Sequence, residues 1–151
     1  MTTMNEFDES WPDVFDAVER LEPDECWNLL AEAGFGRLAI AAVGDLDIFP
    51  INFAVDGTDV VFRTAEGTKL LESLIADLVA IEADHRDCAA GLAWSVVIKG
   101  TPRLLDRYDS IHQAQQLDIT PWIRSMPKER FVRVSARSIT GRRFRAARAG
   151  E

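Results

Sequence analysis

The hydrophobic pattern of the chain changes from helical spacing to strand alternation after Gly34. Apolar side chains recur at helical spacing over 24–33, between Pro23 and Gly34, and therefore predict a helix with a proline at its start and a glycine beyond its end. Further helices are predicted over 10–21, 68–76 and 108–117.

Short runs of β-branched and aromatic residues, bounded by turn residues, predict an antiparallel meander. Asp56-Gly57 indicates a two-residue hairpin turn, since both residues tolerate positive φ. A bend is expected at Gly100-Thr101-Pro102 within one long strand. Strands are predicted over 35–43, 46–55, 59–63, 78–83, 93–105, 130–136 and 139–145, with a polar loop over 84–91. This pattern is typical of a mainly β fold, a barrel with added helices.

Length and cysteine content favour a single cytoplasmic domain. The 151 residues suit one hydrophobic core. Cys26 and Cys88 are far apart and form no CxxC motif, so free thiols are expected. No apolar run is long enough to span a membrane, and the N-terminus lacks the order of a signal peptide.

Charge is distributed unevenly along the chain. The net charge is -8, with acidic residues concentrated before Ala33 and arginines concentrated after residue 123. The C-terminal arginines alternate with apolar residues, as in a strand, and an acidic chain is repelled by a nucleic-acid backbone. The pattern therefore favours an anionic small ligand, or acid–base pairing within an oligomer, over nucleic acid.

One strand-to-helix turn has the composition of an anion site. The strand ending at Phe62 is followed by Arg63, Thr64, Thr68 and Lys69, just where a helix is predicted to begin. Helix N-terminal N–H groups, a bidentate guanidinium and an ammonium together suit a phosphate monoester. An ordinary capped helix with surface charges remains the alternative interpretation of this turn.

Several motifs in order give the chain a resemblance to a known family. They are Gly36-Arg37-Leu38-Ala39, Pro50-Ile51-Asn52-Phe53, Phe62-Arg63-Thr64-Ala65-Glu66-Gly67-Thr68-Lys69-Leu70, Val79-Ala80-Ile81-Glu82-Ala83-Asp84, Trp94-Ser95-Val96-Val97-Ile98-Lys99-Gly100 and Ile139-Thr140-Gly141-Arg142-Arg143. With these pieces the chain resembles the pyridoxamine 5'-phosphate oxidase-like, FMN-binding split-barrel proteins, and in particular the short branch that includes nitroimidazole-resistance proteins.

The resemblance implies a six-stranded split barrel over 22–145, preceded by an acidic extension over 1–21 and followed by a tail over 146–151. It implies a homodimer with two FMN sites at its interface and a flavin-dependent oxidoreductase acting on a small organic molecule. By the same resemblance, the cofactor-binding residues are Pro50, Ile51, Asn52, Arg63, Thr64, Thr68 and Lys69 of one subunit, with Trp94, Ser95 and Arg142, or Arg143, of the other.

Two alternatives share this fold. A related branch binds 8-hydroxy-5-deazaflavin, whose anionic tail also needs basic groups, and a non-catalytic flavin-binding protein would need the same pocket. The C-terminal end, Arg142-Arg143-Phe144-Arg145, is short and has no histidine, which separates this chain from true pyridoxamine-phosphate oxidases.

Other reactive side chains have simpler interpretations. The residues from Asp84 to Cys88 include metal-ligand types, but neighbours on one loop rarely converge on a metal, so none is expected. His112 is predicted to be a surface residue and Trp122 a core or interface residue. No protein nucleophile or base is identified, which suits a site where the cofactor supplies the redox chemistry.

Overall fold

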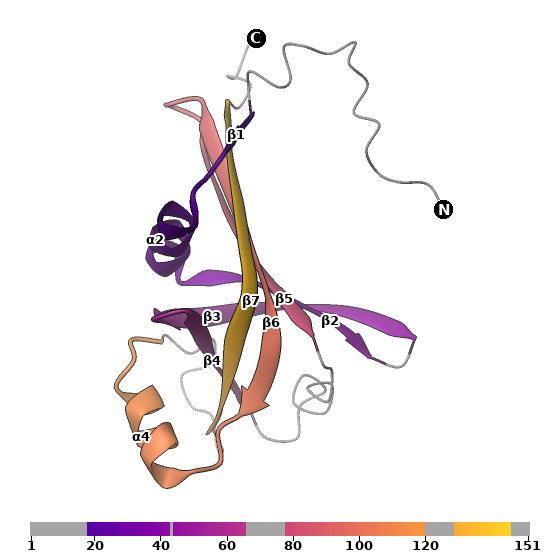
Figure 1. Ribbon diagram of the computed structural model, residues 1–151, viewed down its shortest axis with the longest axis vertical. Helices are drawn as coiled ribbons and strands as arrows, with labels where there is room; N and C mark the ends of the chain where they lie inside the picture. The colour runs from indigo at the N-terminus through magenta and orange to yellow at the C-terminus, as the bar shows by residue number, and fades with distance from the viewer. Residues whose placement is uncertain (1–17, 43, 66–77, 120–128, 146–151) are drawn as a thin grey trace.

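The computed structural model describes residues 18–42, 44–65, 78–119 and 129–145, which form one antiparallel sheet and two helices (Figure 1). The elements are β1 (Val18–Arg20), α2 (Pro23–Ala33), β2 (Phe35–Ala42), β3 (Asp45–Asp56), β4 (Asp59–Ala65), β5 (Val79–Asp87), β6 (Leu92–Leu104), α4 (Tyr108–Gln115) and β7 (Glu129–Arg145). The expected mainly β fold is confirmed.

Six of the strands close into a barrel, and β1 adds a seventh. The strand order is β1-β7-β4-β3-β2-β5-β6, and a further pairing between β6 and β7 closes the ring. β1 pairs with the C-terminal part of β7, whereas β4 pairs with its N-terminal part. The sheet therefore has seven strands and not only the six of the barrel that the resemblance implies, because β1 lies outside the segment that carries the barrel pattern.

The C-terminal strand β7 is continuous, although the sequence predicted two strands there. Lys99 pairs with Ser138 and Gly100 with Ala136, which leaves Arg137 as an extra residue. This β-bulge lets the strand bend without a turn. The bend expected at Gly100-Thr101-Pro102 is thus produced by a bulge between β6 and β7, and both strands continue through it.

Three local predictions are corrected by the backbone. The helix predicted over 10–21 is wrong for Val18–Arg20, because these residues form a strand on the edge of β7. The loop predicted over 84–91 begins later, because β5 continues to Asp87 as it pairs with β6. The hairpin turn is Gly57-Thr58, since Asp56 pairs with Asp59, and Gly57 adopts φ 64°. The helix predicted over 68–76 and the predicted core or interface residue Trp122 lie outside the described residues.

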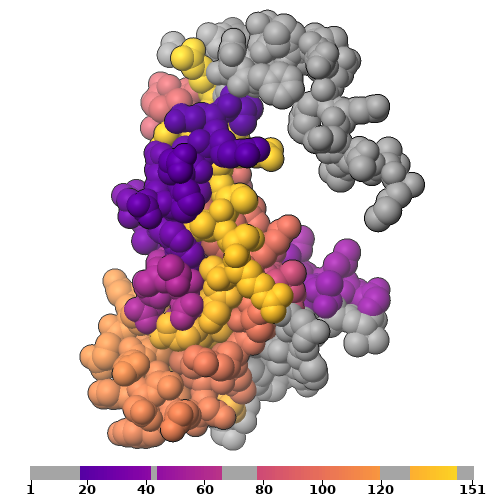
Figure 2. Space-filling model, in the orientation of Figure 1, coloured from indigo at the N-terminus to yellow at the C-terminus, as the bar shows by residue number. Residues whose placement is uncertain are grey.

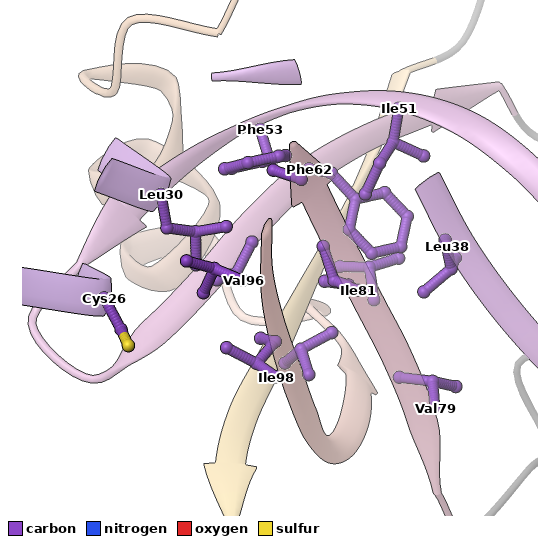
Figure 3. Close-up of a cluster of buried hydrophobic side chains, with 14 of the residues drawn as sticks. Cys26, Leu30, Leu38, Ile51, Phe53, Phe62, Val79, Ile81, Val96 and Ile98 are labelled. Atoms are coloured by element: carbon purple, nitrogen blue, oxygen red, sulfur yellow. The ribbon is translucent and has the colours of Figure 1, made fainter. Parts of the chain in front are cut away.

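Alternate residues of the strands point inward and form the main core (Figure 3). Phe53, Phe62, Leu38, Ile81 and Ile98 are among its largest buried side chains. α2, predicted at this position, ends at Gly34 in the left-handed conformation and places Cys26 and Leu30 against this core. The core therefore extends from the barrel interior to one face of α2.

A second, smaller core lies on the outer face of β4 and β7. Val61 and Phe131 pack there with Leu105, Ala114 and Ile119, beneath the short helix α4. His112 is exposed on α4, as predicted, and stacks with Tyr108 at a ring-centroid distance of 6.4 Å. α4 thus covers one region of the outer sheet face.

Cys26 is buried and Cys88 is exposed, and both are free thiols. Burial raises the pKa of the Cys26 thiol, and the neighbouring Glu25 carboxylate adds to the effect. No helix among the described residues is long and apolar enough to cross a bilayer. The described residues also contain no group of three His, Cys, Asp or Glu side chains that could hold a metal ion.

Candidate functional site

The barrel opens where β3 and β4 part from each other. β3 pairs with β2 from Asp45 to Asn52, but it pairs with β4 only from Phe53 to Asp56. β4 pairs with β7 along its whole length, from Asp59 to Ala65, so its last residues, with Arg63 opposite Phe131, have β7 as a neighbour but not β3. The opening is therefore bordered by the 50–52 segment of β3 and by the 63–65 segment of β4, two of the segments singled out in the sequence.

Arg63 lies on the outer side of β4, where contacts with Ile119 and Phe131 help to hold it in place. Its Nη1 donates a hydrogen bond to the Ile119 carbonyl oxygen at 2.8 Å. Its guanidinium carbon lies 5.6 Å from the centre of the Phe131 ring, which is a cation–π distance. The side chain is partly buried. A preorganised guanidinium at the edge of an opening suits the binding of an anion.

Thr64 points the opposite way from Arg63. Phe62 and Thr64, the residues on either side of Arg63, are both buried, and Thr64 is only 5% exposed. The side chains of Arg63 and Thr64 therefore leave β4 on different faces, so a single phosphate could meet the Arg63 side chain together with the backbone of Thr64. Thr68 and Lys69, the other predicted phosphate ligands, lie outside the described residues.

The predicted ring-binding segment of β3 also divides between the two faces. Ile51 is buried in the main core, whereas Pro50 is exposed and Asn52 is partly exposed on the outer face. Pro50 lies opposite Arg37 of β2 and is not on an edge strand. It stands just before the part of β3 that pairs with β4, so it lies at the opening of the barrel.

The remaining predicted residues lie at the far end of the β6–β7 ribbon. Ser95 pairs with Arg142, and Trp94 pairs with Arg143. Ser95 and Arg142 share the outer face, but Trp94 points inward and packs against the main core. Arg143 also points inward, where it forms ion pairs with Glu25 and with Glu19, the latter at 3.5 Å. Hydrogen bonding to Glu25 raises the pKa of Arg143.

The two groups of predicted residues are far apart within one chain. Arg63 lies opposite Phe131 of β7, and Ser95 lies opposite Arg142 of the same strand. These two positions on β7 are 11 residues apart, which corresponds to roughly 35 Å of extended strand. One protomer therefore does not bring Arg63 and Arg142 to a single small ligand.

An exposed apolar surface lies on the outer face, on the part of β3 that precedes Pro50. Leu46 and Ile48 of β3 are 80% and 70% exposed, and Leu78, just before β5, is 44% exposed. Together they border a groove of about 360 Å³ near the end of the β2–β3 hairpin, which protrudes from the body in Figure 2. The groove is lined by Ala39, Ile40, Ala41, Leu46, Asp47, Ile48, Leu78, Val79, Ala80 and Lys99. Exposed apolar surfaces of this kind mark interaction sites.

A charged cluster lies on the same outer face, between the two groups. Arg37 Nη1 lies 2.9 Å from Glu82 Oε2 and 3.5 Å from Asp84 Oδ1. Partial burial raises the pKa of Glu82, and its hydrogen bond and charge repulsion with Asp84 act in the same direction, whereas Arg37 opposes them. The folded protein therefore holds the Glu82 proton more tightly than the unfolded chain does.

This raised pKa predicts a pH dependence of stability. The folded state holds the Glu82 proton more tightly than the unfolded state does, so protonated Glu82 stabilises the folded protein. This contribution to the free energy of unfolding is complete below the ordinary glutamate pKa of 4.5 and is lost as the pH rises through the raised pKa of Glu82. We expect Glu82→Gln to remove this loss and Arg37→Gln to enlarge it. Urea unfolding at a series of pH values measures both effects, and parallel profiles for all three proteins would contradict the prediction.

The sequence interpretation missed several outer-face residues. The sequence pattern predicts Leu46 and Ile48 only as strand residues and places Arg20 in a helix. Leu46, Ile48 and Pro50 alternate along β3 and therefore share one face, a signal that is visible in the sequence once the strand is correctly assigned. The Arg37–Glu82 pair depends on the register between β2 and β5, which the sequence did not supply.

Comparisons with known proteins find a matching family and similar proteins. A family model described as pyridoxamine 5'-phosphate oxidase matches residues 22–143. An uncharacterized protein of Mycobacterium tuberculosis is 40% identical over 91 residues, which cover 60% of this chain and 80% of that protein.

Two solved structures share the fold. The FAD binding protein from Mycobacterium smegmatis is 40% identical, with a TM-score of 0.74, and the similarity covers 84% of this chain and 100% of that chain. An FAD-binding protein from Mesorhizobium loti has a TM-score of 0.66, with 83% and 97% of the two chains covered; at 23% identity it supports the fold alone.

Proposed function

Because this chain belongs to the pyridoxamine 5'-phosphate oxidase family, we propose that it binds a flavin nucleotide at a site built by two copies of the chain and oxidises or reduces a small organic molecule. The similar protein from Mycobacterium smegmatis is described as FAD binding. One observation carries the proposal: Arg63 lies on the same outer face as Ser95 and Arg142, but roughly 35 Å of strand separates it from them.

A two-fold dimer explains that separation. If two outer faces meet in opposite directions, Arg63 and Asn52 of one protomer approach Ser95 and Arg142 of the other. Such an isologous interface buries the same surface patch of both copies. The exposed Leu46, Ile48 and Leu78 provide apolar surface for this contact. Dimer formation therefore completes the flavin site and also covers the apolar groove.

The residues at the opening fit a flavin phosphate. The phosphate carries about -1.5 to -2 charges at neutral pH, and Arg63 is already oriented by Ile119 and Phe131. In this proposal the phosphate is held by Arg63, by the backbone of Thr64, and by Thr68 and Lys69. The β3 segment from Pro50 to Asn52 lies against the ring, where its backbone and the Asn52 amide orient the polar edge.

The partner contributes the other side of the site. Ser95 and Arg142 share the outer face and offer a hydroxyl and a guanidinium, whereas Trp94 supports them from the inner face by packing against the core. A bound flavin supplies the hydride or electron transfer. The residues of this chain bind and orient the cofactor, exclude water from its ring and leave a cavity beside it for the substrate.

The proposal is tested by flavin titration together with the oligomeric state. We expect the purified protein to be dimeric and to quench FMN or FAD fluorescence with one flavin per chain. Ile48→Asp should place one negative charge from each protomer at the interface, where each charge would lose its hydration. The variant should therefore be monomeric and bind flavin at least about tenfold more weakly. Sedimentation and fluorescence measure the two effects.

Tyr108→Asp is the matched control, because Tyr108 is 84% exposed on α4 and is not among the residues that line the apolar groove. It should leave both measurements unchanged. A titration that includes 8-hydroxy-5-deazaflavin separates the flavin from the deazaflavin branch, and flavin binding without turnover by any electron donor would identify a binding protein. A monomer that binds flavin as tightly as the dimer would contradict the shared site.

A further inference from the structure

Two arginines lie directly opposite each other at the edge of the outer face. Arg20 of β1 is the paired residue of Arg142 of β7, and both side chains are exposed on the same face. Like charges at directly opposite positions of an antiparallel pair are destabilising. Within the part of the chain that the structure describes, neither guanidinium forms an ion pair. Adjacent Arg143 differs, since Glu19 and Glu25 neutralise it.

A cleft of about 470 Å³ lies beside this arginine pair. It occurs where β1 ends and α2 begins, and Figure 2 shows this indigo segment lying along the yellow strand β7. Its lining consists of Arg20, Leu21, Glu22, Pro23, Ile139, Thr140, Gly141 and Arg142. Glu22 is the one carboxylate in this lining and forms no ion pair with either arginine among the described residues. The cleft therefore combines two cations, one carboxylate, a hydroxyl and apolar walls.

We propose that this cleft binds the phosphate group of an organic phosphate ester, with Arg20 and Arg142 as its ligands. Two guanidiniums provide planar, bidentate donors that match phosphate oxygens. The organic part of the ligand lies against Pro23 and Ile139, and the Thr140 hydroxyl lies within the same lining. In a chain with a net charge of -8, an unneutralised arginine pair beside a cleft is best explained by an anionic ligand.

The inference deepens the proposed function and rests on it, because Arg142 is also placed beside the flavin of the partner. The phosphate next to the flavin ring is assigned to Arg63 of the other protomer, so the Arg20–Arg142 pair is available for a second phosphate. That phosphate comes either from the adenylate half of FAD or from a separate phosphorylated ligand. The shared chemistry is a phosphate ester.

The test compares FAD, FMN and AMP as probes for the wild-type protein, Arg20→Gln and Arg145→Gln. Arg145 is a matched control, because it is exposed on the same strand but points to the opposite face. If FAD spans both sites, Arg20→Gln should weaken FAD binding at least tenfold and change FMN binding less than twofold. If the phosphate belongs to a separate ligand, Arg20→Gln should instead abolish AMP binding and change the affinities for FMN and for FAD by less than twofold.

Arg145→Gln should alter none of the three affinities, and melting temperatures should show that both variants are folded. Arg20→Lys keeps the charge without the bidentate geometry and should give an intermediate loss. The proposal is overturned if Arg20→Gln changes neither the ratio of FAD to FMN affinity nor the binding of AMP. Failure of the wild-type protein to bind any flavin would instead overturn the proposed function, and AMP binding would then decide the phosphate site by itself.

Discussion

Arg63→Ala is expected to weaken flavin binding roughly thirty- to a hundredfold, the largest loss of affinity for any single described residue. A hydrogen bond to a charged group contributes about 1.5–3 kcal/mol, and the phosphate would lose a bidentate partner that the protein already holds in position. Fluorescence quenching at fixed salt concentration measures the affinity, since added salt screens the same interaction.

A purely structural role for Arg63 predicts a different outcome. In that case Arg63→Ala would lower stability by about 1–2 kcal/mol through the lost contacts with Ile119 and Phe131, and flavin affinity of the folded protein would not change. Arg63→Lys should restore part of the affinity by restoring the charge. Arg103→Ala, at an exposed position of β6, is the control for a general loss of positive charge.

Gly100→Ala is expected to give a large loss of stability, about 3 kcal/mol or roughly 10 °C in melting temperature. A Cβ atom at this position would collide with the Ser135 carbonyl oxygen, and it would lie 2.9 Å from the Val134 Cγ1 atom. The first obstacle is backbone that is paired within the sheet, so it cannot move away as a flexible side chain could. Thermal and urea unfolding measure the effect.

Gly44→Ala separates steric collision from backbone conformation. Gly44 has φ 77°, and no atom lies within 4 Å of the place that a Cβ would occupy, so alanine there costs only the left-handed conformation, about 1–2 kcal/mol. Equal losses for the two variants would contradict the view that Gly100 is required by the close approach of β7 at the bulge.

The barrel strands were predictable because their signals are local. Alternating apolar residues and glycine turns identified β2, β3, β4 and β6, and Pro23 and Gly34 bounded α2. β1 was missed because Val18–Arg20 is short and gains its partner, β7, from more than 120 residues later. The two predicted C-terminal strands proved to be one, since a bulge at Arg137 bends β7 where the sequence pattern is interrupted.

The candidate site was predictable as a set of residue types but not as a geometry. Arg63 and Thr64 were expected to act together, yet strand alternation directs their side chains to opposite faces. Trp94 and Ser95 separate in the same way. The distance between Arg63 and Arg142 follows from the register of β7 with β4 and β6, a long-range property that neighbouring residues do not encode.

The shared site is tested most directly by mixing two defective proteins. Differently tagged Arg63→Ala and Arg142→Ala chains are combined, and the heterodimer is isolated for flavin titration. If each site takes Arg63 from one protomer and Arg142 from the other, one site carries both substitutions and the second carries neither. We predict that each heterodimer binds one flavin with wild-type affinity. A heterodimer that binds no flavin with wild-type affinity would contradict a flavin site built by two chains.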